Sequence, residues 1–177
     1  MEMFNLLGLL VLLLGSLTAH AETSMSEYQV KALFLLNFIK YVEWPAGAMP
    51  SVTTPIIIGI LGQDNFNDNL NRAVDGKNIN GREIIIKHLS SDDDLSSCSI
   101  LFINSSESAH LSEILRKTGS LPILTVSENE SFLQKGGIIN FLLKEGKIQI
   151  EINLKAAHKA KLQISSKLLS VAVAVKE

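Results

Sequence analysis

The segment 132–154, FLQKGGIINFLLKEGKIQIEINL, constrains the fold of this chain more than any other stretch. Gly136-Gly137 permits a backbone turn that larger residues resist, and we expect Gly137 to require a positive φ. The apolar run 138–143 is long enough for a buried strand, and isoleucines alternate with polar residues over 147–152. We therefore predict an antiparallel hairpin whose two strands are joined through Glu145-Gly146.

Polar residues within this hairpin are candidates for binding a partner or a ligand. Because strand side chains alternate between faces, the three isoleucines of the second strand should face the core and Glu151 the opposite side. Asn140 interrupts an otherwise apolar strand, and Asn153 follows the second strand directly. A structural role for Glu151, such as a hydrogen bond to local backbone or to a lysine, fits the sequence equally well.

The length and composition favour one globular domain with a substantial core. The chain has 177 residues, of which 46% are hydrophobic and 19% charged. Its formal net charge is -2 and its basic residues form no run, so the electrostatic footprint of a nucleic-acid-binding protein is missing. We expect no nucleic-acid partner.

The N-terminus has the pattern of a secretory signal peptide. The apolar run 6–14 is followed by Ala19-His20-Ala21, which has the small-residue spacing that signal peptidases accept. The run is too short for a membrane-spanning helix, which needs about 20 apolar residues. We predict that residues 1–21 are cleaved and that residues 22–177 form a single exported α/β domain.

The chain contains one cysteine, Cys98, so it cannot form an intrachain disulfide. Cys98 stands just before the apolar run 100–103, which favours a buried and inert thiol over a reactive one.

After the signal peptide, short apolar strands alternate with helical segments. Ser24 and Glu27 have the spacing of a capping box, and the helix that follows should end at Trp44-Pro45. We expect strands at 56–61, 84–86, 100–103 and 123–126, and a helix or a terminal strand at 165–175. Helices are expected at 66–74, at 154–161 and over a segment that carries Leu111, Ile114 and Leu115. This order predicts an α/β fold, with a mixed, mostly parallel sheet of about five to six strands, helices on both faces and a C-terminal antiparallel hairpin.

Polar residues follow two of the predicted parallel strands, where sheets of this class bind ligands. Ser105 follows the third strand and Ser127 the fourth, so a small-molecule pocket near Ser105, Ser127 and Glu151 is one possibility. Capping of the next helix is the alternative for Ser105. Trp44, at the end of the first helix, completes the set of candidate residues.

No motif in the sequence predicts an enzyme, a cofactor or a metal site. The consecutive acidic residues 92–94 lack the spacing of a calcium loop, and the histidines are far apart in sequence. Ser105, His158 and Glu151 could supply the parts of a hydrolase triad, but nothing in their spacing selects them.

Several blocks in order along the chain resemble the YfiR family of bacterial periplasmic regulators. They are YQVKA at 28–32, FIKYVEWP at 38–45, ILGQDNF at 60–66, CSILFI at 98–103, GGIINF at 136–141 and EINL at 151–154. The resemblance implies a periplasmic α/β domain that represses a membrane-bound inner-membrane diguanylate cyclase through the periplasmic part of that enzyme. By repressing the cyclase, such a protein would restrain cyclic-di-GMP signalling and biofilm formation.

The resemblance also implies release from the cyclase by an outer-membrane lipoprotein, and formation of a homodimer. A periplasmic small-molecule sensor is the alternative function. One feature departs from the family: its better-studied members pair a cysteine equivalent to Cys98 with one in the first strand. Here that strand has Ile58, Gly59 and Ile60, so this bridge cannot form.

Overall fold

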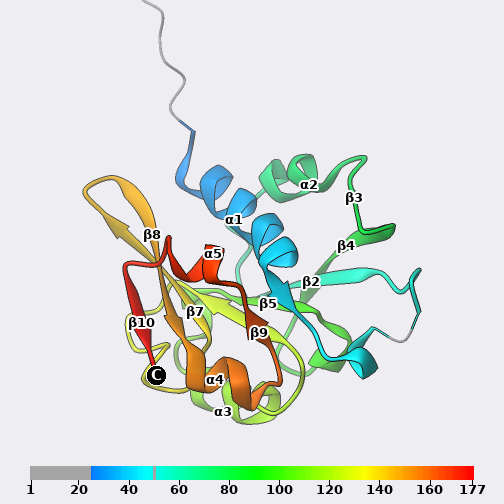
Figure 1. The fold of residues 1–177 in the computed structure, drawn as a ribbon. Helices are drawn as coiled ribbons and strands as arrows, with labels where there is room; N and C mark the ends of the chain where they lie inside the picture. The colour runs from blue at the N-terminus through cyan, green and yellow to red at the C-terminus, as the bar shows by residue number, and fades with distance from the viewer. Residues whose placement is uncertain (1–24, 50) are drawn as a thin grey trace, which may run out of the picture.

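A computed structural model describes residues 25–49 and 51–177, and Figure 1 shows their fold. The predicted signal peptide lies outside the described residues. The helices are α1 (Glu27–Tyr41), α2 (Asp68–Val74), α3 (Leu111–Thr118), α4 (Leu154–Lys159) and α5 (Ser166–Leu169), with 3-10 turns at Ala46–Ala48, Leu95–Ser97 and Ser105–Glu107. The strands are β1 (Val42–Glu43), β2 (Ile56–Leu61), β3 (Asn78–Ile79), β4 (Arg82–Leu89), β5 (Ile100–Ile103), β6 (Leu124–Ser127), β7 (Ile139–Lys144), β8 (Lys147–Asn153), β9 (Gln163–Ile164) and β10 (Ala174–Lys176).

Eight strands form one mixed, mostly parallel sheet in the order β10-β8-β7-β6-β5-β2-β4-β3. Among the described strands of this sheet, only the β7–β8 and β3–β4 pairs are antiparallel, which confirms the predicted α/β fold. The sheet has more strands than the five to six predicted because β3 and β10 lie at its two edges. Strands of two or three residues are too short to produce a periodic pattern in the sequence.

The predicted hairpin is present, with Lys144 opposite Lys147 and Asn140 opposite Glu151. Its turn residues Glu145 and Gly146 both have positive φ, 52° and 71°, as a two-residue hairpin turn of the type I′ class requires. The prediction for the preceding loop was wrong, because Gly136, with φ of 97°, occupies the positive region and Gly137 does not. Gly137 is instead required sterically: a Cβ there would lie 2.3–2.5 Å from the ring of Phe132.

The sheet separates two hydrophobic cores, because successive side chains of a central strand point to opposite faces. Ile56, Ile58 and Ile60 of β2 belong to the larger core, which contains the buried side chains of α1, α2, α4 and α5. The smaller core on the other face contains Leu61 together with the buried side chains of α3 and the loop before β7. Helices therefore cover both faces, as Figure 1 shows.

Helix α1 differs from its prediction at both ends. Its capping box consists of Ser26 and Gln29, not Ser24 and Glu27: the Ser26 hydroxyl accepts from the Gln29 backbone, and the Gln29 side chain accepts from the Ser26 backbone. Ser24 lies outside the described residues. The helix ends at Tyr41, before Trp44-Pro45, because Val42 leaves it to pair with Ile164 of β9.

The remaining boundary corrections concern α2, β4 and the C-terminal segment. Helix α2 begins at Asp68, two residues later than predicted. Phe66 lies in the loop before the helix, where its ring packs edge-on against Phe102, with ring centroids 4.9 Å apart. Strand β4 spans residues 82–89, longer than the apolar core of 84–86 that predicted it. The C-terminal segment, predicted as helix or strand, contains both α5 and β10.

Candidate functional site

A buried lysine in the first turns of α1 is the centre of the most developed polar cluster among the described residues. Lys31 is 2% exposed, and its side chain forms ion pairs with Glu27 of the same helix and with Glu128, which directly follows β6. Its ammonium also lies 4.4 Å from the centroid of the Tyr28 ring. We call Glu27, Tyr28, Lys31, Asn65, Asn104 and Glu128 the Lys31 cluster.

Loops at the carboxyl ends of three parallel strands position Asn65, Asn104 and Glu128 of the Lys31 cluster. The Tyr28 hydroxyl donates to Glu128 over 3.0–3.1 Å and accepts from the Asn65 amide, beyond β2, over 2.9 Å. The Asn104 amide, directly after β5, reaches Glu128 at 3.4 Å. The cluster therefore lies between β2 and β5, where the strand order reverses, which is the usual ligand site of such sheets.

The electrostatics of the Lys31 cluster keep the lysine charged. Burial by itself lowers the pKa of Lys31, but the hydrogen bonds and charges of Glu128 and Glu27 outweigh this effect, so the pKa is raised. Burial also raises the pKa of the Tyr28 hydroxyl, opposed by the hydrogen bond from Asn65. Lys31 is therefore a fixed ammonium, unsuited to act as a nucleophile or a general base at neutral pH.

The arrangement of the Lys31 cluster is suited to holding helix α1 against the sheet. The cluster joins the first turns of α1 to the loops after β2, β5 and β6 through charge-assisted hydrogen bonds. Sequence reasoning missed Lys31, although Leu35 and Phe38, four and seven residues further along the helix, are both fully buried. A lysine on a buried helical face is the signal that would have identified it.

Three of the predicted site residues lie in one row across the sheet. Ser127 of β6 is in register with Asn140 of β7, and Asn140 is in register with Glu151 of β8. Ser127 is fully buried and its hydroxyl donates to the Ile103 carbonyl at 2.6 Å, so it is not available to a ligand. Asn140 is also buried, and its side-chain oxygen has no hydrogen-bond partner among the described residues, whereas Glu151 is half-buried.

The other predicted residues lie apart from this row. Asn153 caps α4: its side-chain oxygen accepts from Ala156, and its amide donates to the Leu133 carbonyl at 3.1 Å. Trp44 donates from its indole to the Ser99 carbonyl at 3.3 Å, just before β5 and thus at the opposite end of that strand from the Lys31 cluster. Ser105 is exposed in the 3-10 turn after β5.

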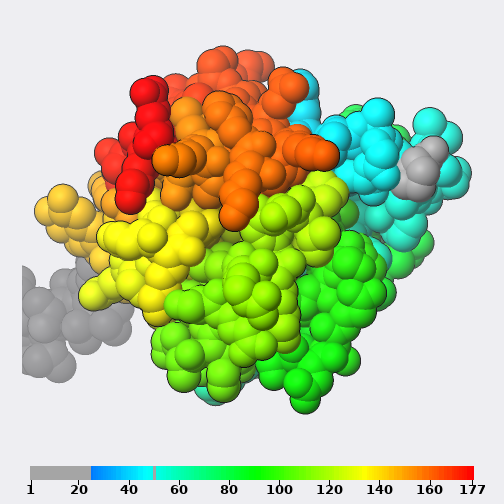
Figure 2. All heavy atoms as spheres, turned by 90° about the horizontal axis from the view of Figure 1, so that it is seen from below, coloured from blue at the N-terminus to red at the C-terminus, as the bar shows by residue number. Residues whose placement is uncertain are grey.

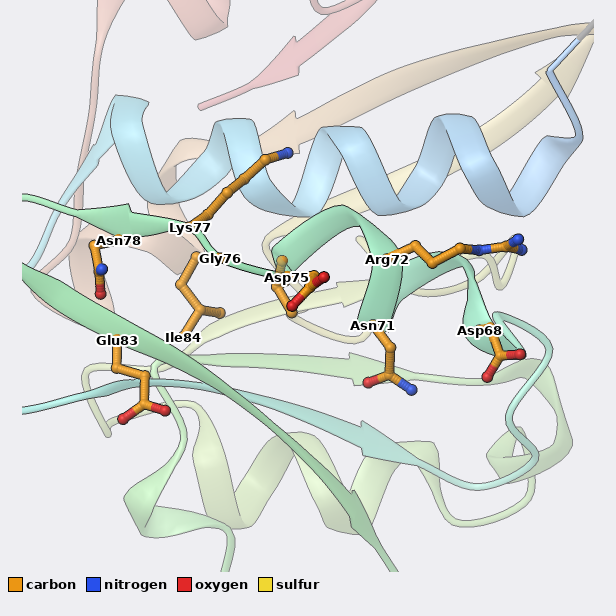
Figure 3. A pocket seen from close by; sticks show the side chains of 10 residues that line it. Asp68, Asn71, Arg72, Asp75, Gly76, Lys77, Asn78, Glu83 and Ile84 are labelled. Carbon is orange, nitrogen blue, oxygen red and sulfur yellow. The ribbon is translucent and has the colours of Figure 1, made fainter.

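The small-molecule pocket near Ser105, Ser127 and Glu151 stays a prediction. An open hollow of about 770 Å³ lies between α2 and the β3–β4 edge and is lined by other residues. In Figure 3 its charged side chains, Arg72, Asp75, Lys77 and Glu83 among them, point in different directions. Ligand sites normally present a few convergent polar groups, and this hollow presents none.

Cys98 is buried, 4% exposed, in the smaller core, as predicted. Burial raises the pKa of its thiol to about 11, so the reactive thiolate is scarce at neutral pH. Gly59 of β2 faces it: a Cβ at this glycine would lie 2.7 Å from the Cys98 sulfur.

Within residues 25–49 and 51–177, no helix is long and apolar enough to cross a membrane.

Comparisons with known proteins place the chain in a family. A search of curated proteins found no match. A conserved domain protein from Vibrio cholerae O1 biovar El Tor has a similar crystal structure, with a TM-score of 0.58 and 11% identity, a likeness that concerns the fold alone. The match covers 86% of this chain and 61% of that protein, so this chain spans less than two thirds of that protein's length.

The family comparison covers most of the chain. The model of the YfiR/HmsC-like family matches residues 28–173, a range that includes every member of the Lys31 cluster except Glu27. The chain therefore belongs to the YfiR/HmsC-like family.

Proposed function

We propose that this protein is a periplasmic regulator that binds and represses a membrane-bound diguanylate cyclase, and thereby restrains cyclic-di-GMP signalling and biofilm formation. The observation that carries the proposal is the family match over residues 28–173. Release by an outer-membrane lipoprotein and formation of a homodimer, which the family resemblance implies, belong to the same proposal. A regulatory role also suits the Lys31 cluster, in which the ammonium is held by carboxylates instead of facing a substrate.

An exposed apolar edge supports protein binding. Val171, Val173 and Val175 are 59%, 51% and 41% exposed, in and just before β10, the outermost strand of the sheet. Leu143, 59% exposed, lies in β7 near the hairpin turn. Exposed apolar groups at the edge of a sheet are typical of a surface that a partner covers.

The test of the proposed function is a cellular one. Deleting the protein from cells that carry the cognate cyclase should raise cyclic-di-GMP and biofilm mass, and re-expression should reverse both changes. Affinity purification of the tagged protein from detergent-solubilised membranes should recover the cyclase. Unchanged cyclic-di-GMP after deletion, with no cyclase recovered, would exclude this function.

Export is part of the proposal and has its own measurement. Intact-mass analysis of the periplasmic fraction should give a chain that begins at Glu22, after cleavage following Ala21. A chain that retains Met1 and stays in the cytoplasm would contradict it.

Glu151 is the predicted site residue best placed to belong to the regulatory surface. It is half-buried in β8, between Asn140 of β7 and Ala174 of the edge strand β10. Glu151→Gln preserves the shape and removes the charge, so it should leave the melting temperature unchanged and raise cyclic-di-GMP. A clear loss of stability, or normal cyclic-di-GMP, would remove Glu151 from the functional residues.

A further inference from the structure

Among residues 25–49 and 51–177, strand β10 leaves a main-chain edge unpaired at one end of the sheet. It pairs with β8 on one side only, and it is the outermost strand in the order. On β8, the Asn153 N–H donates to the Ile138 carbonyl toward β7, so the main-chain groups of Ile150 and Ile152 point toward β10. Because Ala174 is in register with Glu151, Ala174 and Lys176 pair with these groups, and the N–H and carbonyl of Val175 point outward, toward the side on which the described residues place no strand.

A lysine-rich groove lies beside this edge. A hollow of about 530 Å³ between α3, α4, the loop before β7 and the end of β10 is lined by Lys135, Lys155, Lys159 and Lys176. Figure 2 views the molecule from the side on which α3, α4, this loop and β10 are all visible. None of the four lysines forms an ion pair with a carboxylate of the described residues, although Glu177 also lines the hollow. We call this hollow the lysine groove.

The lysine groove and the apolar edge lie on opposite faces of the same strand. Lys176 is in register with Asn153, which lines the groove. Val175 is in register with Ile152, which belongs to the larger core on the other face. A strand added beyond β10 would therefore present alternate side chains to lysines and to valines.

We propose that β10 binds an extended acidic segment of the protein partner, which adds to the sheet as a further strand. Its main chain pairs with the outward N–H and carbonyl of Val175, its carboxylates reach the lysine groove, and its apolar side chains cover Val173 and Val175. This inference rests on the proposed function only in expecting a protein partner, and it states the chemistry that recognises that partner.

Two other occupants fit the observations less well. A second copy of this chain, paired edge to edge through β10, would bring two lysine grooves of the same charge together. An anionic membrane could attract the lysines, but they surround a hollow, and lipid offers no groups that continue a sheet.

A peptide with the predicted alternation tests the inference directly. We would measure binding of a fluorescently labelled, capped heptapeptide TEVEVET to the exported chain by anisotropy, with TQVQVQT as the uncharged control. The acidic peptide should bind, the control peptide about tenfold more weakly, and added salt should reduce the difference. Equal binding of the two peptides, or no binding of either, would overturn the inference.

Variants of the protein separate the two halves of the site. Lys155→Glu/Lys159→Glu should reduce affinity for the acidic peptide by about tenfold or more, since it reverses two charges of the groove. Lys40→Glu/Lys77→Glu, a matched double reversal of exposed lysines outside the groove, should change it little. Val175→Pro removes the outward N–H and should weaken both peptides while the melting temperature stays near that of the parent.

Two further results would overturn the inference while leaving the proposed function intact. One is binding to vesicles that contain phosphatidylglycerol, with the same dependence on Lys155 and Lys159 and no competition from the peptide. The other is normal repression of cyclic-di-GMP by Lys155→Glu/Lys159→Glu in cells. Failure of the proposed function is a separate result, because cyclic-di-GMP would then not respond to the unmodified protein either.

Discussion

Replacing Lys31 by methionine should destabilise the fold more than removal of an exposed lysine does. Lys31→Met retains most of the side-chain volume but leaves Glu128, whose side chain is only 13% exposed, without its cation. Breaking a buried ion pair on one side costs about 3–5 kcal/mol, because an uncompensated charge stays buried. The entropy of unfolding of a domain of this size is about 0.3 kcal/mol per degree, so the melting temperature should fall by about 10–17 °C.

The matched control is Lys117→Met, which removes a pair with Glu113 four residues away whose two side chains are about half exposed. Exposed pairs contribute less than about 1 kcal/mol, so the control should melt within a few degrees of the parent. The double variant Lys31→Met/Glu128→Gln should recover much of the lost stability, since it leaves no buried charge unpaired. Differential scanning calorimetry of all four proteins decides the matter. Equal losses for Lys31→Met and Lys117→Met would refute the reasoning.

Three further predictions follow from packing and ionisation. Gly137→Ala should cost about 1–3 kcal/mol, because its Cβ would overlap the fully buried ring of Phe132, whereas Gly47→Ala, with no atom within 4 Å of its Cβ, should not alter the melting temperature. Gly59→Cys should form a disulfide with Cys98 after Leu89 shifts aside. Closing the loop should then stabilise the oxidised protein by up to about 4 kcal/mol, and equal melting with and without reductant would contradict this. The thiol pKa of Cys98 rises from 9.0 to about 11 on folding, so its contribution to stability is complete below pH 9 and is lost as the pH rises through 11. Between pH 8 and 11 the parent should therefore lose more melting temperature than Cys98→Ala, and parallel curves would exclude this effect.

The sequence alone was sufficient for the elements whose residues repeat a physical requirement several times. The β7–β8 hairpin was predicted with its turn, because isoleucines alternate over several positions and Glu145-Gly146 can adopt positive φ at both residues. The central strands β2 and β5 were predicted for a similar reason, since a strand buried on both faces must be apolar throughout. Burial of Cys98 followed from its place beside β5.

Only the tertiary structure determined what depends on long-range contacts. Lys31 and Glu128 are 97 residues apart in sequence, and no local pattern indicates that they pair. The end of α1 at Tyr41 depends on pairing with β9, and the need for glycine at residue 137 depends on the position of Phe132. The lysine groove likewise combines residues from α4, β10 and the loop before β7, which are separate segments of the sequence. Local sequence specifies backbone preference and which residues tend to be buried, whereas these contacts arise only when the sheet brings distant segments to one end or one edge.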